Sequence, residues 1–370
     1  MLVALVAATG LTGTVPATAG ATVSGAAASG VAAGRGAEGL DASARGVEGR
    51  AGAALTFRKY VALGDSYTAG PLIPFFTFDP LGCFKSTRNY PRYLRDRIEV
   101  AEFTDASCSG ADTSHMTVSQ SIPLGTHGPQ FDKLPADADL VTVGIGGNDF
   151  GTFGKLVGTC PTLRATDPTG TPCRDHFTVD GVDTVKSALP EIGRRVAGVL
   201  EGVRAKAPRA TIVVVGYPRL VPPSGTCPDV VPFADGDYRW ADSVERGLNR
   251  QLRRAALLTD ATYVDTYTPS RGHDACAGDE AWVNGQHTDI FAAASYHPFA
   301  SYMAAAASLI QDILAGVTPN PARAAAAARS ADGQVSTYGE RELSEDEQRA
   351  LAEAGLSHGG TSAGTLCPTG

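Results

Sequence analysis

The chain has 370 residues, of which 43% are hydrophobic and 19% charged. That is enough to bury a substantial core, and it excludes a fully disordered or fibrous protein. Lysine and arginine number 31 against 39 aspartate and glutamate residues, for a net charge of -8. No basic stripe interleaved with aromatic residues occurs, so the sequence lacks the phosphate-neutralising surface that nucleic-acid binding needs, and we expect no nucleic-acid partner.

The chain begins with a segment typical of an export signal. Residues 1–34 carry no charged side chain, and the apolar run Leu2–Ala8 precedes Pro16-Ala17-Thr18-Ala19, which fits an A-x-A cleavage site. We therefore predict a signal peptide over 1–19 and a secreted protein, although no Lys or Arg precedes the apolar run. The run is shorter than the ~20 residues of a membrane helix, so we expect no stable membrane span. The Ala/Gly/Ser-rich residues 20–55 indicate a disordered linker or pro-segment.

Further along, short hydrophobic runs alternate with longer stretches of helical period. The runs of strand length are Phe57–Leu63, roughly Glu102–Ser107, Leu140–Ile145, Thr211–Val215 and Thr262–Asp265. The stretches with helical period are Tyr90–Arg97, Val182–Ala205, Tyr238–Leu258 and Pro298–Ala315. Five strands alternating with helices predict an α/β fold, a single three-layer α/β/α sandwich over residues 56–317 with a five-stranded parallel sheet. Ligands bind such a sheet outside the carboxyl ends of its strands, so residues there are candidate site residues.

The composition changes after Val317. Pro319–Ala328 is rich in alanine and low in complexity, while Ser344 with Glu347 forms a capping-box pattern ahead of Gln348–Leu356. We interpret 318–370 as a solvated, low-complexity tail with one short helix. The alternative is a helix that binds a partner.

Six of the seven cysteines lie in the predicted core, and Cys367 lies in the tail. An exported chain meets oxidising conditions, and no C-x-x-C spacing indicates a zinc site, so we expect disulfides and no metal. Six cysteines allow many pairings, but pairing of sequence neighbours closes the smallest loops. That pairing is Cys83–Cys108, Cys160–Cys173 and Cys227–Cys276, with Cys367 unpaired.

Four short patterns follow the predicted strands. In Gly64-Asp65-Ser66-Tyr67 a strand ends where a helix begins, which would place the Ser66 hydroxyl and nearby backbone donors at the crevice, as a nucleophile requires. The alternative is an ordinary helix-capping turn. In Cys108-Ser109-Gly110-Ala111, Gly110 would present an unobstructed N–H to a ligand, although turn glycines are common.

The third pattern is Gly144-Ile145-Gly146-Gly147-Asn148-Asp149, in which Asn148 is placed to donate its side-chain amide to an oxyanion or, alternatively, to form a turn or cap. It is not a dinucleotide fingerprint, because Asp149 stands where the last glycine would be, and no phosphate-binding G-x-x-x-x-G-K-[ST] occurs. The fourth pattern is His297-Pro298, in which Pro298 suits the first position of a helix. His297 would then lie at its cap on the crevice side, as a base for a serine, with His287 as the alternative.

In this order the four patterns resemble those of the SGNH, or GDSL-type, hydrolase family, and especially its secreted actinobacterial lipases and esterases. The resemblance spans Phe57–Val317, the whole predicted core. It implies a flavodoxin-like SGNH hydrolase fold without a cofactor, with Ser66 as nucleophile and His297 as general base. It also implies an oxyanion hole formed by the Ser66 N–H, the Gly110 N–H and the Asn148 side chain. The three sequential disulfides are similar to the arrangement in that branch.

Two positions depart from the family pattern. Tyr67 follows Ser66 where members usually have leucine, a change familiar in the actinobacterial branch. The family commonly places an aspartate three residues before the histidine, but here that residue is Ala294. Some secreted relatives are similar in using a backbone carbonyl at this point, so we predict a Ser66–His297 dyad supported by the carbonyl of Ala294 or Ser295. The alternative is a remote carboxylate, from Asp274, Asp279 or Asp289.

The resemblance therefore implies a secreted carboxylic ester hydrolase, a lipase or esterase, that forms an acyl-enzyme on Ser66. We expect a monomer that acts on a lipid or small ester; a phospholipase of the A type is an alternative, and so is a non-catalytic binding module on the same scaffold. Three long loops follow the strands, Pro71–Asn89, Gly151–Gly181 and Pro218–Gly236. The phenylalanines of the first either line an acyl groove or pack beneath the loop. They are Phe75, Phe76 and Phe78.

Overall fold

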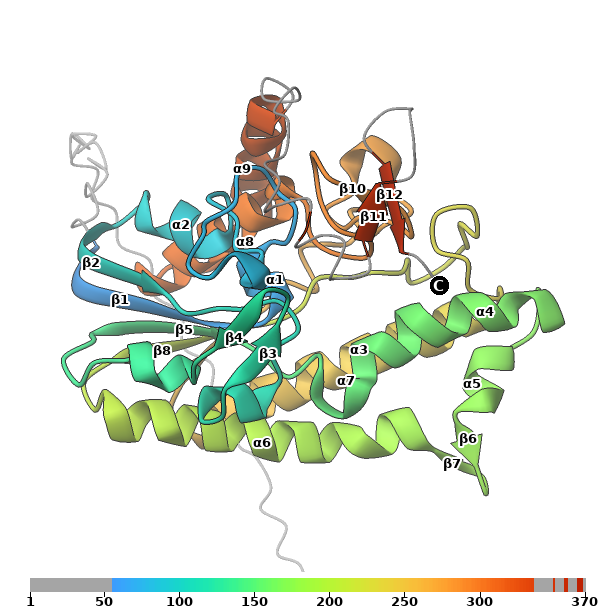
Figure 1. Cartoon of the computed structure of the whole chain (residues 1–370), viewed down its shortest axis with the longest axis horizontal. Helices are drawn as coiled ribbons and strands as arrows, with labels where there is room; N and C mark the ends of the chain where they lie inside the picture. The colour runs from blue at the N-terminus through green and yellow to red at the C-terminus, as the bar shows by residue number, and fades with distance from the viewer. Residues whose placement is uncertain (1–54, 336–348, 350–355, 359–364, 369–370) are drawn as a thin grey trace, which may run out of the picture. The chain divides into compact units, whose positions relative to one another are not determined.

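The computed structural model of the chain describes residues 55–335, 349, 356–358 and 365–368 (Figure 1). The signal peptide expected over 1–19 lies outside the described residues, and so does the linker expected over 20–55, apart from Leu55. Most of the short helix expected over Gln348–Leu356 and the side chain of Cys367 also lie outside them.

A five-stranded parallel sheet forms the centre of the described fold, as the alternating pattern predicts (Figure 1). Its strands in spatial order are β2 (Glu99–Asp105), β1 (Thr56–Gly64), β5 (Leu140–Gly144), β8 (Thr211–Val215) and β9 (Thr262–Val264). Every residue of β5 is buried, as expected of a central strand covered on both faces. The chain order reverses beside β1, and Gly64 pairs with Gly144 at the carboxyl ends of β1 and β5. Such a switch point is where ligands bind an open parallel sheet.

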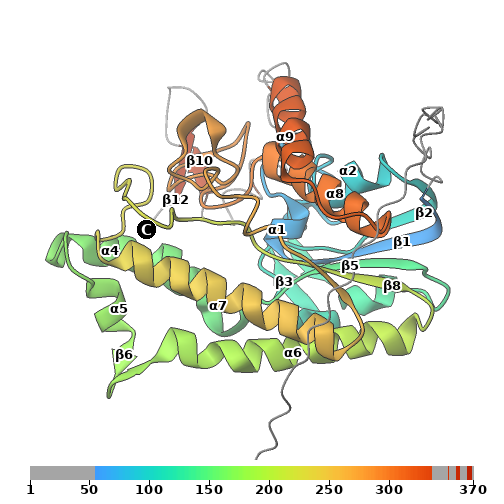
Figure 2. The ribbon, with the colours of Figure 1, turned by 180° about the vertical axis from the view of Figure 1, so that it is seen from behind.

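Helices cover both faces of the sheet (Figures 1 and 2). These helices are α2 (Tyr90–Arg95), α6 (Thr184–Lys206), α7 (Asp237–Leu258) and α8 (Ala300–Leu314). Val61 and Leu63 of β1 pack with α6 and α7, whereas Tyr60 and Ala62 pack with α2 and α8. This alternation follows from the two-residue period of a strand, and it divides the core into two apolar layers.

The alanine-rich segment after Val317 differs from the expected solvated tail, because it contains a packed helix, α9 (Pro321–Val335). Ala324, Ala328 and Ala331 are buried together with the alanines of α8. Their spacing of four and three residues places them on one helical stripe, and their small side chains let two helices approach closely. At the start of α9, Arg323 pairs with the buried Asp312 of α8.

Short elements fill the segments between the long ones. The helical ones are α1 (Ser66–Ala69), α3 (Thr152–Gly154), α4 (Cys160–Leu163) and α5 (Pro172–His176). Single turns of tighter or wider helix lie at Leu81–Cys83, Thr113–Met116, Gln130–Lys133, Asp149–Gly151, Lys155–Thr159, Arg164–Thr166 and Gly278–Glu280. The paired strands are β3 (Gln120–Ile122) with β4 (Gly125–His127), β6 (Thr178–Val179) with β7 (Val182–Asp183), and β12 (Thr365–Pro368) between β10 (Thr288–Asp289) and β11 (Leu356–His358).

The predicted disulfide pairing is confirmed. Disulfides join Cys83 to Cys108, Cys160 to Cys173 and Cys227 to Cys276. The first of them ties the loop after α1 to the loop after β2, so it joins two segments that lie at the carboxyl end of the sheet.

Candidate active site

Ser66 lies where β1 ends, as the first residue of α1. Asp65 caps this helix, and its Oδ1 accepts a hydrogen bond of 2.9 Å from the Tyr67 N–H. Within the described part of the chain the Ser66 N–H donates no hydrogen bond, as expected for a group in the first turn of a helix. A Cβ on Gly64 would lie 2.6 Å from the Gly144 oxygen, so the approach of β1 to β5 beneath Ser66 requires glycine.

The structure brings the loops of Gly110 and Asn148 together. The Asn148 Nδ2 donates a hydrogen bond of 2.9 Å to the oxygen of Ala111, the residue after Gly110. Gly110 has a φ of 78°, a conformation that favours glycine. Its N–H donates no hydrogen bond among the described residues, and the Asn148 amide keeps a second proton. Asn148 and Ser66 line the same pocket.

His297 packs beside this pocket, with its ring centroid 5.7 Å from that of Tyr67 and 5.5 Å from that of Phe153. Its Nδ1 lies 2.7 Å from the Ser295 oxygen, so Nδ1 carries the proton in the neutral ring and Nε2 is left as an acceptor. Burial lowers the pKa of His297 to about 4. The imidazole is therefore neutral near pH 7, which is the form that a general base requires.

The Ser295 carbonyl, rather than a remote carboxylate, is the partner of the His297 ring. Asp274 accepts instead from the Cys276 N–H and Asp289 from the Phe291 N–H. His287, the alternative base, is exposed. Within the described residues, the Ser66 hydroxyl makes no hydrogen bond to His297.

The expected helix cap at His297 is wrong. Helix α8 begins at Ala300, so His297 precedes the helix. The cause is backbone pairing with an upstream segment: the Asn284 N–H donates to the His297 oxygen at 2.9 Å, and the Phe299 N–H donates to the Trp282 oxygen at 2.9 Å. These bonds hold the residues around Pro298 in an extended conformation and fix the position of the imidazole.

A buried hydrogen-bond network that sequence reasoning missed connects the nucleophile turn to the Asn148 turn. The Tyr217 hydroxyl donates to Asp65 and accepts from the Gly147 N–H at 2.9 Å. Burial raises the pKa of Asp65 to about 7. Tyr217 follows β8 by two residues, so its place at the carboxyl edge of the sheet was a usable signal.

Asp149 holds the loops that carry Gly110 and Asn148. It is fully buried, and it accepts from the Thr113 hydroxyl at 2.6 Å and from the Thr113 N–H at 3.1 Å. Arg195 of α6 forms an ion pair of 3.2 Å with the same carboxylate. Asp149 therefore fixes the segment after β2 against the segment after β5.

An apolar pocket opens beside Ser66. Its walls come from the segments after β5 and β8 and from α7, and its apolar side chains include Phe153, Leu156, Leu220, Val244 and Leu248. Glu245 of α7 also lines it. The Glu245 Oε2 accepts from the Leu220 N–H at 3.3 Å, while its buried Oε1 has no partner in the described structure. Burial raises the pKa of this carboxyl well above its usual value.

The phenylalanines of Pro71–Asn89 do not form this pocket. Phe76 is buried against Leu72, Phe84 and Ile290, beneath its own loop. Phe78 is 63% exposed. The apolar pocket beside Ser66 thus comes from the second and third long loops and from α7.

A parallel α/β/α sandwich with a serine at its switch point and a neutral, partly buried histidine beside the same pocket defines the class of serine ester hydrolases. The model of the GDSL-like Lipase/Acylhydrolase family matches residues 62–304, well over half of the 370 residues, and the chain belongs to this family. The resemblance to GDSL-type hydrolases, the predicted fold and the predicted class of enzyme are thereby confirmed.

Named relatives agree with this assignment. The chain is 38% identical over 234 residues to Lipase 2 of Streptomyces coelicolor, covering 60% of this chain and 75% of the relative. It is 32% identical over 257 residues to an esterase of Streptomyces scabiei, covering 61% and 74%. Among solved structures it is similar to phospholipase A1 from Streptomyces albidoflavus NA297, with a TM-score of 0.55 and 29% identity over 67% of this chain and 95% of that one. No helix in the described part of the chain combines the length and the apolar character needed to cross a membrane.

Proposed function

We propose that the protein is a secreted carboxylic ester hydrolase in which Ser66 is the nucleophile and His297 the general base. The observation that carries the proposal is the 2.7 Å contact between His297 Nδ1 and the Ser295 oxygen. It fixes the tautomer with a free Nε2 on a ring that packs beside the Ser66 pocket. The three disulfides and the N-terminal sequence support secretion, because disulfides persist in oxidising compartments.

Three donors that have no partner among the described residues support an oxyanion hole. They are the Ser66 N–H, the Gly110 N–H and one proton of the Asn148 amide. Donors that are already oriented stabilise the developing oxyanion without reorganisation, which is usually the largest contribution to acyl-transfer catalysis. A non-catalytic binding module would have no need for such a group of donors beside a serine.

The reaction follows from these positions. The Ser66 Oγ attacks the ester carbonyl carbon while its proton passes to His297 Nε2, and the three donors hold the carbonyl oxygen as it becomes negative. The tetrahedral intermediate collapses to an acyl-serine, and the leaving alcohol takes the proton from His297. Water then attacks the acyl-serine, with His297 accepting and returning a proton in the same way.

The Ser295 carbonyl replaces the carboxylate of a full triad. It orients the ring and stabilises imidazolium through the Nδ1–H bond, but as a neutral acceptor it contributes less charge than an aspartate would. Catalysis by the dyad therefore relies on the orientation of the His297 ring more than on a negative charge at Nδ1.

The apolar pocket supports a lipid or small-ester substrate, whose acyl chain would lie against Phe153, Leu156 and Leu248. A phospholipid is a second candidate, since one similar solved structure is described as a phospholipase A1. Both substrates place an acyl ester carbonyl at Ser66, and they differ only in the alcohol that leaves.

The test is hydrolysis of p-nitrophenyl esters, from acetate to palmitate, by the oxidised protein and by Ser66→Ala in the presence of a chelator. Activity should survive chelation and fall at least about 10³-fold in Ser66→Ala. A folded, oxidised wild type that is inert on every ester would overturn the proposal and favour a binding module.

A further inference from the structure

A second cavity lies beside the carboxyl end of β2, the edge strand, and shares no lining residue with the pocket at Ser66. Segments far apart in the sequence form it: the loop before α2, α2 itself, the end of β2, and the end of β4 with the turn after it. We call it the basic pocket, after its basic side chains. They are Lys85, Arg92, Arg95, His127 and Lys133.

The positive charge of the basic pocket is only partly neutralised. Arg95 pairs with Asp96 at 2.6 Å, but Lys85, Arg92 and Lys133 have no ion pair among the residues that the structure describes. The Lys85 ammonium donates one hydrogen bond, of 2.8 Å, to the main-chain oxygen of Asp105.

Two carboxylates, Asp79 and Asp105, share the cavity. The Asp105 carboxylate is already bonded to the Asn89 amide at 2.7 Å and to the Ser107 hydroxyl at 2.6 Å. With Arg95 neutralised by Asp96, the two acids face three permanent cations, Lys85, Arg92 and Lys133, and this excess of positive charge favours an anion.

Three of the side chains that line this cavity carry a buried polar atom without a partner in the described structure. Lys85 is only 3% exposed and His127 only 6%. Within the described structure the His127 Nδ1, the Arg92 Nε and the Thr77 Oγ1 are buried and make no hydrogen bond. Buried polar groups in proteins are nearly always paired, so three unpaired atoms on side chains that line one charged cavity favour a polar ligand at this site.

We propose that the basic pocket binds a phosphate group, either free phosphate or the phosphate of a lipid headgroup. The planar guanidinium of Arg92 suits two phosphate oxygens at once, and Lys85 and Lys133 supply point charges. The Thr77 hydroxyl and the His127 ring donate to the remaining oxygens. A phosphate has enough acceptor oxygens for all of these donors, whereas a carboxylate has two oxygens and a single charge.

The basic pocket adjoins the loop that carries Gly110. The ring of His127 has a nitrogen within 4.8 Å of the sulfurs of the Cys83–Cys108 disulfide. The Ser109 N–H, just before Gly110, donates to the Cys83 oxygen at 3.1 Å. The Cys83–Cys108 disulfide therefore lies between a phosphate in the basic pocket and the loop that carries Gly110. The proposed phosphate site does not depend on the chemistry at Ser66.

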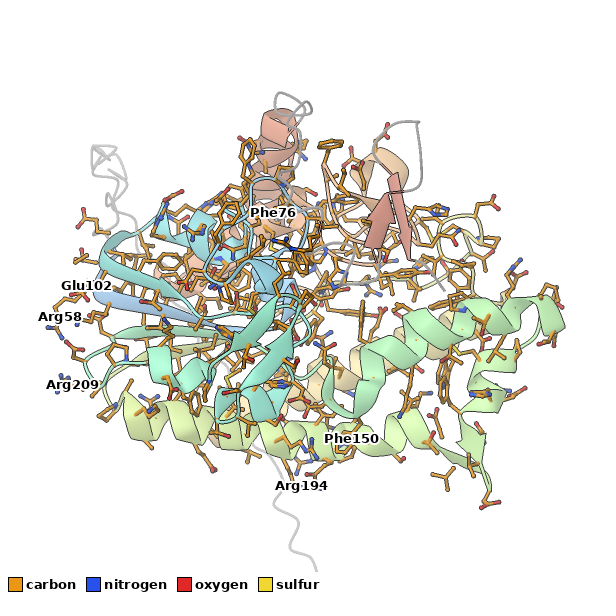
Figure 3. The ribbon with its side chains drawn as sticks, in the orientation of Figure 1. Arg58, Phe76, Glu102, Phe150, Arg194 and Arg209 are labelled. Atoms are coloured by element: carbon orange, nitrogen blue, oxygen red, sulfur yellow. A yellow bond between two sulfur atoms is a disulfide. The ribbon has the colours of Figure 1, made fainter. Side chains whose placement is uncertain are left out.

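The test is calorimetric titration of the oxidised full chain with inorganic phosphate. The pocket variant is Arg92→Gln/Lys133→Gln. The control is Lys206→Gln/Arg209→Gln, which removes the same charge between the end of α6 and the start of β8; Figure 3 labels Arg209. The pocket variant should raise the phosphate Kd at least about tenfold, as expected for losing charge-assisted hydrogen bonds, and the control should leave it unchanged.

A second arm separates the two sources of phosphate. Ser66→Ala, which leaves lipids intact, is sedimented with phosphatidylcholine vesicles that contain phosphatidic acid, with and without the pocket substitutions. Vesicle binding that the substitutions abolish assigns the site to a headgroup, and phosphate binding without vesicle binding assigns it to the free anion. If neither probe binds, or if pocket and control variants bind alike, the proposal is wrong. Retained ester hydrolysis shows that both double variants fold. If the pocket double variant does not fold, the single variant Lys133→Gln, at an exposed residue, replaces it.

Discussion

The Nδ1 of His297 lies 2.7 Å from the main-chain oxygen of Ser295, a residue only two positions earlier in the chain. The proposed base is thus oriented by its own backbone, and no distant carboxylate has to be brought to it. This arrangement explains how Ala294 can stand where related hydrolases carry an aspartate.

The pH dependence of catalysis follows from the burial of this ring. Burial lowers the pKa of His297 to about 4, so the base is neutral above that pH and becomes protonated as the pH falls through it. We expect kcat/KM for a soluble ester to stay level from pH 7 to 5 and to fall with an apparent pKa near 4. An acidic limb near the ordinary histidine value of 6.5 would contradict this account.

The same shift affects stability with a definite sign. The folded-state pKa is below the unfolded value of 6.5, so the contribution of His297 is fully present above pH 6.5 and is lost as the pH falls through about 4. Urea unfolding of the wild type and of His297→Phe between pH 7 and 4 isolates the contribution of His297 to the unfolding free energy. The difference in unfolding free energy between the two should shrink as the pH falls, and a constant difference would contradict the shift.

Substitution of Asn148 tests the proposed oxyanion hole without disturbing the fold. Asn148→Ala removes a proposed oxyanion donor that lines the Ser66 pocket and one hydrogen bond to Ala111. We expect kcat to fall by about 10²- to 10³-fold with KM little changed, since the lost interaction forms mainly in the transition state. A rise in KM with kcat unchanged would indicate a role in substrate binding instead.

Tyr217 acts as a positioning residue, through Asp65 and Gly147. Tyr217→Phe should lower the unfolding free energy by about 1–3 kcal/mol, because it leaves buried partners unpaired, and it should also lower kcat. Tyr60→Phe is the control: it loses a buried bond of 2.9 Å to Thr142 in the opposite core layer, so its stability should fall while kcat stays level. Equal kcat values for the two variants would refute a positioning role for Tyr217.

Glu245 is the acidic residue of α7 that lines the apolar pocket in which we propose that the acyl chain binds. Its carboxyl is buried among apolar side chains with Oε1 unpaired, which disfavours an alkyl chain at that point. Glu245→Leu should therefore raise kcat/KM for p-nitrophenyl palmitate relative to acetate by about tenfold, mainly through KM. Glu245→Gln keeps the polarity and should leave the ratio near that of the wild type; an unchanged ratio in the leucine variant would place the acyl chain elsewhere.

Much of the fold was predictable because its signals are local. The unbroken apolar run of β5 indicated a central strand, and motifs at strand ends converge in any parallel sheet. The packing of α9 was harder to predict, because its alanine stripe differs little in composition from a low-complexity tail.

The parts of the site that escaped prediction depend on tertiary contacts. Tyr217 and Glu245 belong to no motif, and only the folded structure shows that they meet Asp65 and the pocket. The choice between the Ala294 and Ser295 carbonyls likewise depends on how the backbone around His297 pairs with Asn284.

The most direct test of the central claim is labelling with a serine-reactive fluorophosphonate, followed by peptide mapping with mass spectrometry. The account predicts one adduct on Ser66, loss of ester hydrolysis in step with labelling, and no adduct in Ser66→Ala. An adduct on another serine, or ester hydrolysis that persists undiminished in Ser66→Ala, would contradict it.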